Sequence, residues 1–258
     1  MRRLVICAGI ALIFAAAMTA QTPSDGFYFA QDANYTNNQR NQVVLQVQGG
    51  KITSANWNLL SLAAGSQDLK SIARAGQVAG AVTWAGEAAK AESFLVTSQN
   101  VNATSVAGVA SNFNVGPFFT LVKAALAASP ISKGIYSKDG WYFALAASPD
   151  EYHTRNSVLI TIVNGTIVDV LWNGAVVGLP ASMNPSKMIL SRNNQYPMTG
   201  AKSSWDQQAE AVALELKNAQ NPDLLKMKAD GTADGISGAS MLINHFLDVA
   251  KQALAAAR

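Results

Sequence analysis

The chain has 258 residues, of which 49% are apolar and only 14% are charged, so it can build a sizeable core and is not a disordered polar chain. Its length suits one large domain or two of ordinary size. Without Arg2 and Arg3, 17 basic residues stand against 16 acidic ones, and no long basic run remains. This balance argues against a nucleic-acid-binding protein.

Residues 1–20 are typical of a signal peptide. Arg2 and Arg3 precede an apolar run over 4–17, and small residues then lead to an expected cut after Ala20, with Ala17 as the alternative. The run is too short and Ala-rich for a good membrane span, although an uncleaved anchor stays open. Cys7, the only cysteine, lies near the start of the run rather than at its end, so it is not a lipidation site. We therefore expect an exported protein, periplasmic or associated with the cell envelope, without a disulfide.

Sequence blocks recur in the same order along the chain, which indicates a tandem duplication. In each copy a short aromatic block is followed by two apolar runs that meet at a glycine-containing turn and end in Trp-Asn. Such turns require positive φ and predict a β-hairpin. The aromatic blocks are 26–30 and 140–144, the paired runs are 43–57 and 158–172, and the turns are Gly49-Gly50 and Asn164-Gly165.

Two helices are predicted after each hairpin. The closing blocks 118–128 and 246–256 are Ala-rich, with apolar residues at helical spacing. The earlier helix of the second copy is expected from Trp205 to Ala219, because Ser204 and Gln207 have the spacing of a capping box. Its counterpart is expected from Trp84 to about residue 96.

These patterns predict an α+β fold, a tandem duplication of a small domain with a β-hairpin-based antiparallel sheet and C-terminal helices. The expected organisation is a signal peptide over 1–20, a first domain over 21–130 and a second domain over 131–258. Four tryptophans at matched positions are interpreted first as packing residues, namely Trp57, Trp84, Trp172 and Trp205.

The copies differ most just before the last helix. The second has Asp234-Gly235-Ile236-Ser237-Gly238-Ala239-Ser240, whereas the matching segment 104–110 keeps one glycine and lacks the aspartate and both serines at the corresponding positions. The two glycines allow the backbone to approach a ligand. Ser240 is expected at or near the N-cap of the final helix, where a phosphate binds readily. On spacing alone, a Gly/Ser turn capped by Ser240 explains the same residues.

The segment resembles the D-[AG]-x-S-G-A-[ST] motif of the FMN-binding domain family, which includes flavin-carrying subunits of sodium-pumping and related membrane redox complexes and many exported lipoproteins. The resemblance covers residues 134–258 well and 26–128 weakly, so the first domain is expected to be a degenerate FMN-binding-like domain. It implies that a flavin transferase joins FMN to Ser240 through a phosphoester. The implied recognition and phosphate-loop residues are Asp234, Gly235, Ser237, Gly238 and Ala239.

The resemblance predicts an exported carrier of covalent FMN that transfers electrons among membrane or extracellular partners, not an enzyme with its own turnover. Ala110 stands where Ser240 would, so one flavin is expected per chain. Tyr196 or Trp205 would suit stacking on the isoalloxazine ring. Two alternatives stay open. The protein is a flavin-free surface-antigen or ligand-binding module of the same fold, or it binds FMN without a covalent bond. With two histidines, His153 and His245, and no cysteine outside the signal peptide, a zinc site is improbable. His245 is expected on the last helix as a polar surface or cap-region residue rather than a base.

Overall fold

The computed structural model describes residues 23–63, 67–76, 78–180 and 185–258. The expected signal peptide and Cys7 lie outside these residues. Within them, no helix is both long and apolar enough to cross a membrane.

Each half of the chain forms a three-stranded antiparallel sheet, which confirms the α+β class. The first sheet contains β1 (Gly26–Gln31), β2 (Gln39–Gln48) and β3 (Lys51–Ser61), in the order β1-β2-β3. The second contains β4 (Gly140–Leu145), β5 (Thr154–Val163) and β6 (Thr166–Val176), in the order β4-β5-β6.

The two hairpin turns have the backbone conformation that their sequences predict. Gly49 and Gly50 have φ of 58° and 69°, and Asn164 and Gly165 have φ of 53° and 73°. Positive φ at both central residues matches the twist of the flanking strands, and glycine and asparagine adopt it with little strain. The local sequence therefore fixes the register of both hairpins.

Helices follow each sheet in the same order. The first half has α1 (Leu69–Arg74), α2 (Ala79–Ser98) and α3 (Gly116–Ala127). The second has α4 (Lys187–Arg192), α5 (Trp205–Ala219), the 3-10 turn η2 (Pro222–Leu224) and α6 (Asn244–Ala255). The expected capping box at the start of α5 is present. The helix expected to start at Trp84 starts earlier, at Ala79, as α2. The sequence patterns did not predict α1 and α4, because six residues are too few to show a periodicity.

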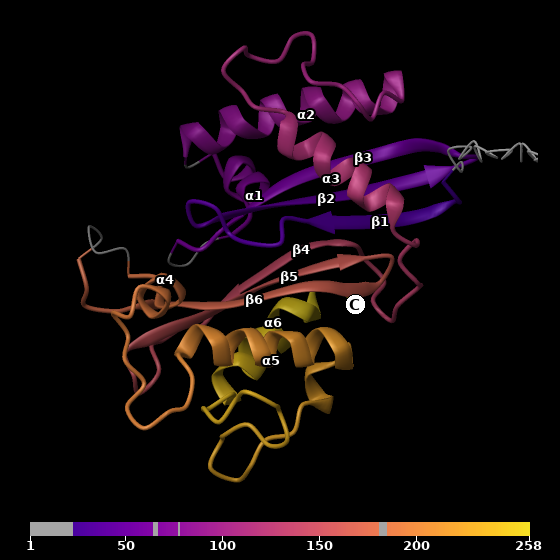
Figure 1. The fold of residues 1–258 in the computed structure, drawn as a ribbon. Helices are drawn as coiled ribbons and strands as arrows, with labels where there is room; N and C mark the ends of the chain where they lie inside the picture. The colour runs from indigo at the N-terminus through magenta and orange to yellow at the C-terminus, as the bar shows by residue number, and fades with distance from the viewer. Residues whose placement is uncertain (1–22, 64–66, 77, 181–184) are drawn as a thin grey trace, which may run out of the picture.

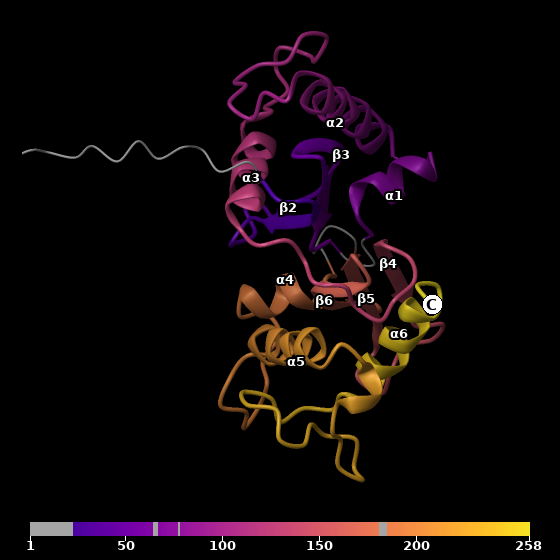
Figure 2. The same ribbon diagram turned by 90° about the vertical axis from the view of Figure 1, so that its right-hand side faces the viewer.

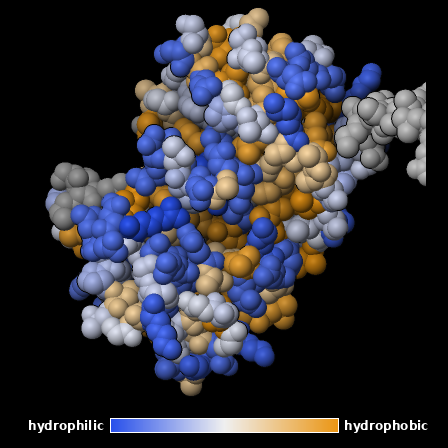
Figure 3. All heavy atoms as spheres, viewed as in Figure 1, coloured by the Kyte–Doolittle hydropathy of each residue, from blue (hydrophilic) through white to orange (hydrophobic). Residues whose placement is uncertain are grey.

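The two sheets face each other in the middle of the molecule, and the helices lie outside them (Figures 1 and 2). Helices α2 and α3 cover the outer face of the first sheet, and α5 and α6 cover that of the second. Each half therefore has its own core between sheet and helices, with Trp57 in the first and Trp172 in the second, both 2% exposed. On the face in Figure 3, apolar residues are visible between the polar surfaces of the two halves.

The duplication extends to individual hydrogen bonds. The indole N–H of Trp57 donates to Asn41 Oδ1 (2.9 Å), and that of Trp172 donates to Asn156 Oδ1 (3.1 Å). Trp57 also lies edge-on to Trp84 at 5.3 Å between ring centroids, as Trp172 does to Trp205 at 5.4 Å. The matched tryptophans are packing residues, as their pairing in the sequence predicted.

Where the sheets meet, a buried polar cluster joins the halves. Asp169 of β6 accepts hydrogen bonds from Arg40 (2.5 Å), Gln31 (3.2 Å) and the buried Gln42 (2.8 Å) of the first half. Gln42 in turn accepts from the indole of Trp141 (2.7 Å). A buried carboxylate is tolerated only when it is paired in this way, so the cluster fixes how the halves dock.

Candidate functional site

The Asp-Gly-Ile-Ser-Gly-Ala-Ser motif forms a loop closed by backbone pairing at its two ends. The Ala233 N–H donates to the Met241 carbonyl (2.9 Å), and the Ile243 N–H donates to the Gly231 carbonyl (2.9 Å). Because residues 241–243 continue this extended pairing, α6 begins only at Asn244, with Ile243 as its N-cap. The expectation that Ser240 caps the final helix is therefore wrong.

Most of the motif lies on the surface. Asp234, Gly235, Ser237, Gly238 and Ser240 are exposed and Ala239 is half-buried, while Ile236 is buried and anchors the loop. Gly235 and Gly238 have φ of 72° and 84°, a region that favours glycine. Backbone conformation thus explains both glycines without any ligand.

Ser240 is held by the buried side chain of Gln208 in α5. Its N–H donates to Gln208 Oε1 (2.9 Å), and its hydroxyl lies 3.4 Å from the same oxygen. In the first half the Ala110 N–H donates to Glu87 Oε2 (2.8 Å). Glu87 lies three residues after Trp84, as Gln208 lies three residues after Trp205. Gly108, like Gly238, has positive φ. The two loops share this hydrogen bond and the positive-φ glycine, and Ala110 occupies the position of Ser240.

Ser240 is the one motif residue that lines a cavity of about 380 Å³ in the second half. The other motif residues do not border it, and Ser240 itself lies at its solvent-exposed edge. The side chains around the cavity come from the start of β5, β6, α4, the loop before α5, α5 itself and the start of α6. They include Asp150, Tyr152, Asn156, Trp172, Lys187, Tyr196, Met198, Thr199, Trp205, Thr232, Leu242 and His245.

Lys187 supplies a buried positive charge in this cavity. Its Nζ lies 4.7 Å from the ring centroid of Trp205 and 4.8 Å from that of Tyr196, and the residue is 5% exposed. Burial lowers the pKa of Lys187 to about 8, although Asp150 and Glu151 oppose the shift. A charge desolvated to this degree attracts an anionic ligand strongly.

Sequence reasoning missed Lys187. It is the first residue of α4, after the N-cap Ser186, and the matching residue after the N-cap Asp68 of α1 is Leu69. Aligning the two copies through their Trp-Asn pairs and the following short helices would have shown the replacement. The short helices themselves carried no periodic signal.

Aromatic and polar side chains complete the rim. Burial raises the pKa of Tyr196, which lies against Lys187, and Tyr152 is exposed at the edge. His245 is on α6, as expected, and its Nε2 lies 2.9 Å from Glu151 Oε2. The cavity therefore combines a hydroxyl, a cation and aromatic faces, and its volume falls in the range of small-molecule sites.

No protein-family model matches the chain, and no curated protein does. Two solved structures are similar to part of it. The solution structure of a protein from Clostridium thermocellum is 38% identical, covers 47% of this chain and 93% of its own, and has a TM-score of 0.37. The crystal structure of a protein from Clostridium perfringens is 22% identical, covers 48% of this chain and 89% of its own, and has the same TM-score of 0.37. Neither description states a ligand or an activity.

Proposed function

We propose that this protein is an exported flavoprotein that carries one FMN, joined through its phosphate to the Ser240 hydroxyl. One observation carries the proposal. Of the hydroxyl groups in the motif, that of Ser240 alone borders a cavity, and this cavity also holds the buried cation of Lys187 and the rings of Tyr196 and Trp205. These groups suit a phosphate, a flat ring and an acceptor hydroxyl in one place, which is what supports the proposal.

Attachment requires a flavin transferase and a flavin donor whose phosphate is activated in a pyrophosphate. The Ser240 Oγ–P bond forms while the pyrophosphate P–O bond breaks, and the rest of the donor leaves with a phosphate. The hydroxyl proton passes to a base of the transferase, because Gln208, the hydrogen-bond partner of Ser240, is an amide that accepts a hydrogen bond but takes up no proton at neutral pH.

The residues of the chain have distinct roles in this proposal. Gln208 fixes the backbone of Ser240, and Lys187 neutralises phosphate charge inside the cavity. The half-buried Tyr196 provides a ring surface for the isoalloxazine, and Trp205 is buried beside it as part of the cavity wall. The flavin supplies the electron-transfer chemistry, and the protein sets its orientation and surroundings. Electron donors and acceptors would be membrane or extracellular proteins at the cell envelope.

The test is the intact mass of the protein expressed with and without a flavin transferase. We expect a gain of one FMN less one water with the transferase, lost in Ser240→Ala and retained in Ser237→Ala. Ser237 is an exposed serine of the same loop and is the matched control. Far-UV circular dichroism should show both variants folded. A bare mass for the wild-type protein, or flavin retained by Ser240→Ala, would contradict the proposal.

A flavin-free ligand-binding module is the second candidate. The observation that favours it is that the cavity already combines a buried cation, Lys187, with aromatic rings, whether or not Ser240 is modified. A bare mass together with saturable binding of free FMN, weakened by Lys187→Met, would support this candidate and the non-covalent mode.

A further inference from the structure

We propose that the cleft between the two halves is a second ligand site, for a planar aromatic ring that carries a phosphate or carboxylate group. This site lies outside the Ser240 cavity and does not depend on the function proposed above. It would give the first half a ligand-binding role, although Ala110 stands there in place of the acceptor serine.

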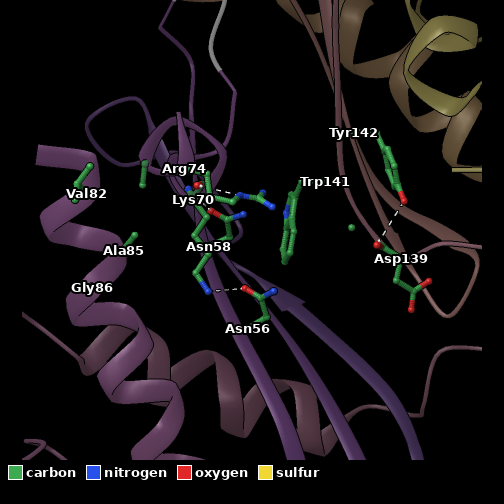
Figure 4. A pocket seen from close by; sticks show the side chains of 12 residues that line it. Asn56, Asn58, Lys70, Arg74, Val82, Ala85, Gly86, Asp139, Trp141 and Tyr142 are labelled. Carbon is green, nitrogen blue, oxygen red and sulfur yellow. Dashed lines mark hydrogen bonds between the residues drawn. The ribbon is translucent and has the colours of Figure 1, made fainter. Parts of the chain in front are cut away.

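The cleft is a cavity of about 780 Å³, larger than the one at Ser240. Its walls are β3, α1 and α2 of the first half and the start of β4 in the second half. Figure 4 shows Trp141 from β4 standing opposite Asn56, Asn58 and Arg74. A volume of this size accommodates a mononucleotide or a ligand of similar size.

Trp141 presents a fixed aromatic surface to this cleft. Its indole N–H donates to Oε1 of the fully buried Gln42 (2.7 Å), and the Thr161 hydroxyl donates to the same oxygen (3.0 Å). The ring is therefore held in place by the polar cluster between the sheets. A rigid, partly exposed indole is a good stacking surface, since little side-chain entropy is lost on binding.

Arg74 supplies a positive charge that no carboxylate neutralises. Its guanidinium donates to the Lys70 carbonyl (3.4 Å) and the Ser71 hydroxyl (2.9 Å), and it forms no ion pair with any residue that the structure describes. The matching Arg192 of the second half pairs with Glu210 at 2.6 Å. At the place of Glu210 the first half has Ala89, so the duplication has left this arginine free to pair with an anion.

Two neighbouring positions of the cleft wall are also polar in the first half and apolar in the second. Asn56 of β3 corresponds to Leu171 of β6, and Lys70 of α1 corresponds to Met188 of α4. Lys70 is neutralised by Glu92 (2.5 Å) and donates to Asn56 Oδ1 (2.7 Å), which leaves the Asn56 amide N–H groups for a ligand. The cleft therefore offers the Arg74 cation, amide donors and a ring face, the groups that recognise a planar anion. Asp139, the carboxylate in its lining, already accepts from the Asn164 N–H (2.7 Å) and the Gly165 N–H (2.8 Å).

Gly86 provides a way to close the cleft without disturbing the fold. It lies in α2 on the cleft wall, and a Cβ built on it meets nothing within 4 Å. Gly80 lies in the same helix, also has nothing within 4 Å of a built Cβ, and does not line the cleft. Gly86→Phe should place a ring in the cleft and obstruct a ligand between α2 and Trp141, and Gly80→Phe is the matched control.

The experiment is calorimetric titration of the protein expressed without flavin transferase, using FMN and AMP, with riboflavin and adenosine as uncharged counterparts. We expect saturable binding of at least one of the two phosphates, at least roughly tenfold tighter than its uncharged counterpart. Gly86→Phe should abolish binding and Gly80→Phe should leave it unchanged. Arg74→Ala should remove the preference for the phosphate.

Three results would overturn the proposal. The first is that neither phosphate shows saturable binding up to about 1 mM. A dissociation constant above that concentration corresponds to a binding free energy too weak for specific recognition. The second is unchanged binding in Gly86→Phe, which places the ligand elsewhere, for example in the Lys187 cavity. The third is a phosphate preference that survives Arg74→Ala. Covalent attachment at Ser240 is measured by mass with the transferase, so either proposal can fail without the other.

Discussion

Replacing Lys187 by methionine should stabilise the protein at neutral pH. The two side chains are similar in length, and the rings of Trp205 and Tyr196 against Lys187 suit a thioether. Burial lowers the pKa of Lys187 from its ordinary value of 10.5 to about 8. Each pKa unit corresponds to 1.36 kcal/mol. Keeping the ammonium charged in the folded protein, rather than in the unfolded chain, is therefore unfavourable by about 3 kcal/mol at pH 7.

Part of that penalty is offset by the attraction of the ammonium to Trp205 and Tyr196, on the order of 1 kcal/mol for each ring. We therefore expect Lys187→Met to raise the free energy of unfolding by about 1–2 kcal/mol at pH 7. Between about pH 8 and 10.5 the unfolded chain keeps the proton that the folded protein has released, so wild-type stability rises with pH. The advantage of the variant should shrink across this window.

Urea unfolding of both proteins at pH 7 and near pH 10 measures the effect, because other titrating groups cancel in the difference. Leu69→Met, at the matching position of α1, is the control and should show a small change that does not depend on pH. A loss of stability in Lys187→Met at pH 7, or an equal difference at both pH values, would refute the reasoning. A cation kept at the expense of stability is expected where a site binds an anion.

Other predictions follow from the duplication and from buried charges. Asn41→Ala and Asn156→Ala should each lower the free energy of unfolding by about 1–3 kcal/mol, since each leaves a tryptophan N–H unpaired, and urea unfolding should give similar values for the two. Asp169→Ala should cost about 3 kcal/mol by removing the acceptor that joins the halves, and calorimetry should then resolve two transitions in place of one. Lys70→Met leaves Glu92, whose pKa burial already raises, without its counter-charge. Lys70→Met should therefore lower the free energy of unfolding by about 2 kcal/mol at pH 7. The loss should be smaller at pH 5, because a carboxyl group with a raised pKa in the folded protein stabilises the fold as pH falls. Urea unfolding at both pH values checks this.

Local chemistry made several features predictable. The turns at Gly49-Gly50 and Asn164-Gly165 need positive φ, and Ser204 with Gln207 caps a helix, so these elements form as their sequences indicate. The short helices α1 and α4 escaped prediction because they depend on their N-caps Asp68 and Ser186 and on packing rather than on a periodic face.

The candidate site was only partly predictable. The motif pointed to Ser240, yet the sequence placed it at a helix cap, and pairing between residues 231–233 and 241–243 moved the start of α6 to Asn244. Lys187 had no motif of its own. It becomes notable only because α4 brings it against Trp205 and Tyr196.

The amino-acid sequence by itself determined the duplication, the two hairpins and the asymmetry between Ser240 and Ala110, because each depends on residue types at short spacing. Tertiary structure alone decided that Ser240 shares a cavity with a buried lysine, and that Trp141 faces Arg74 across the join of the halves (Figure 4). These neighbours are far apart in the chain, and only the packing of helices on sheets and of sheet against sheet brings them together.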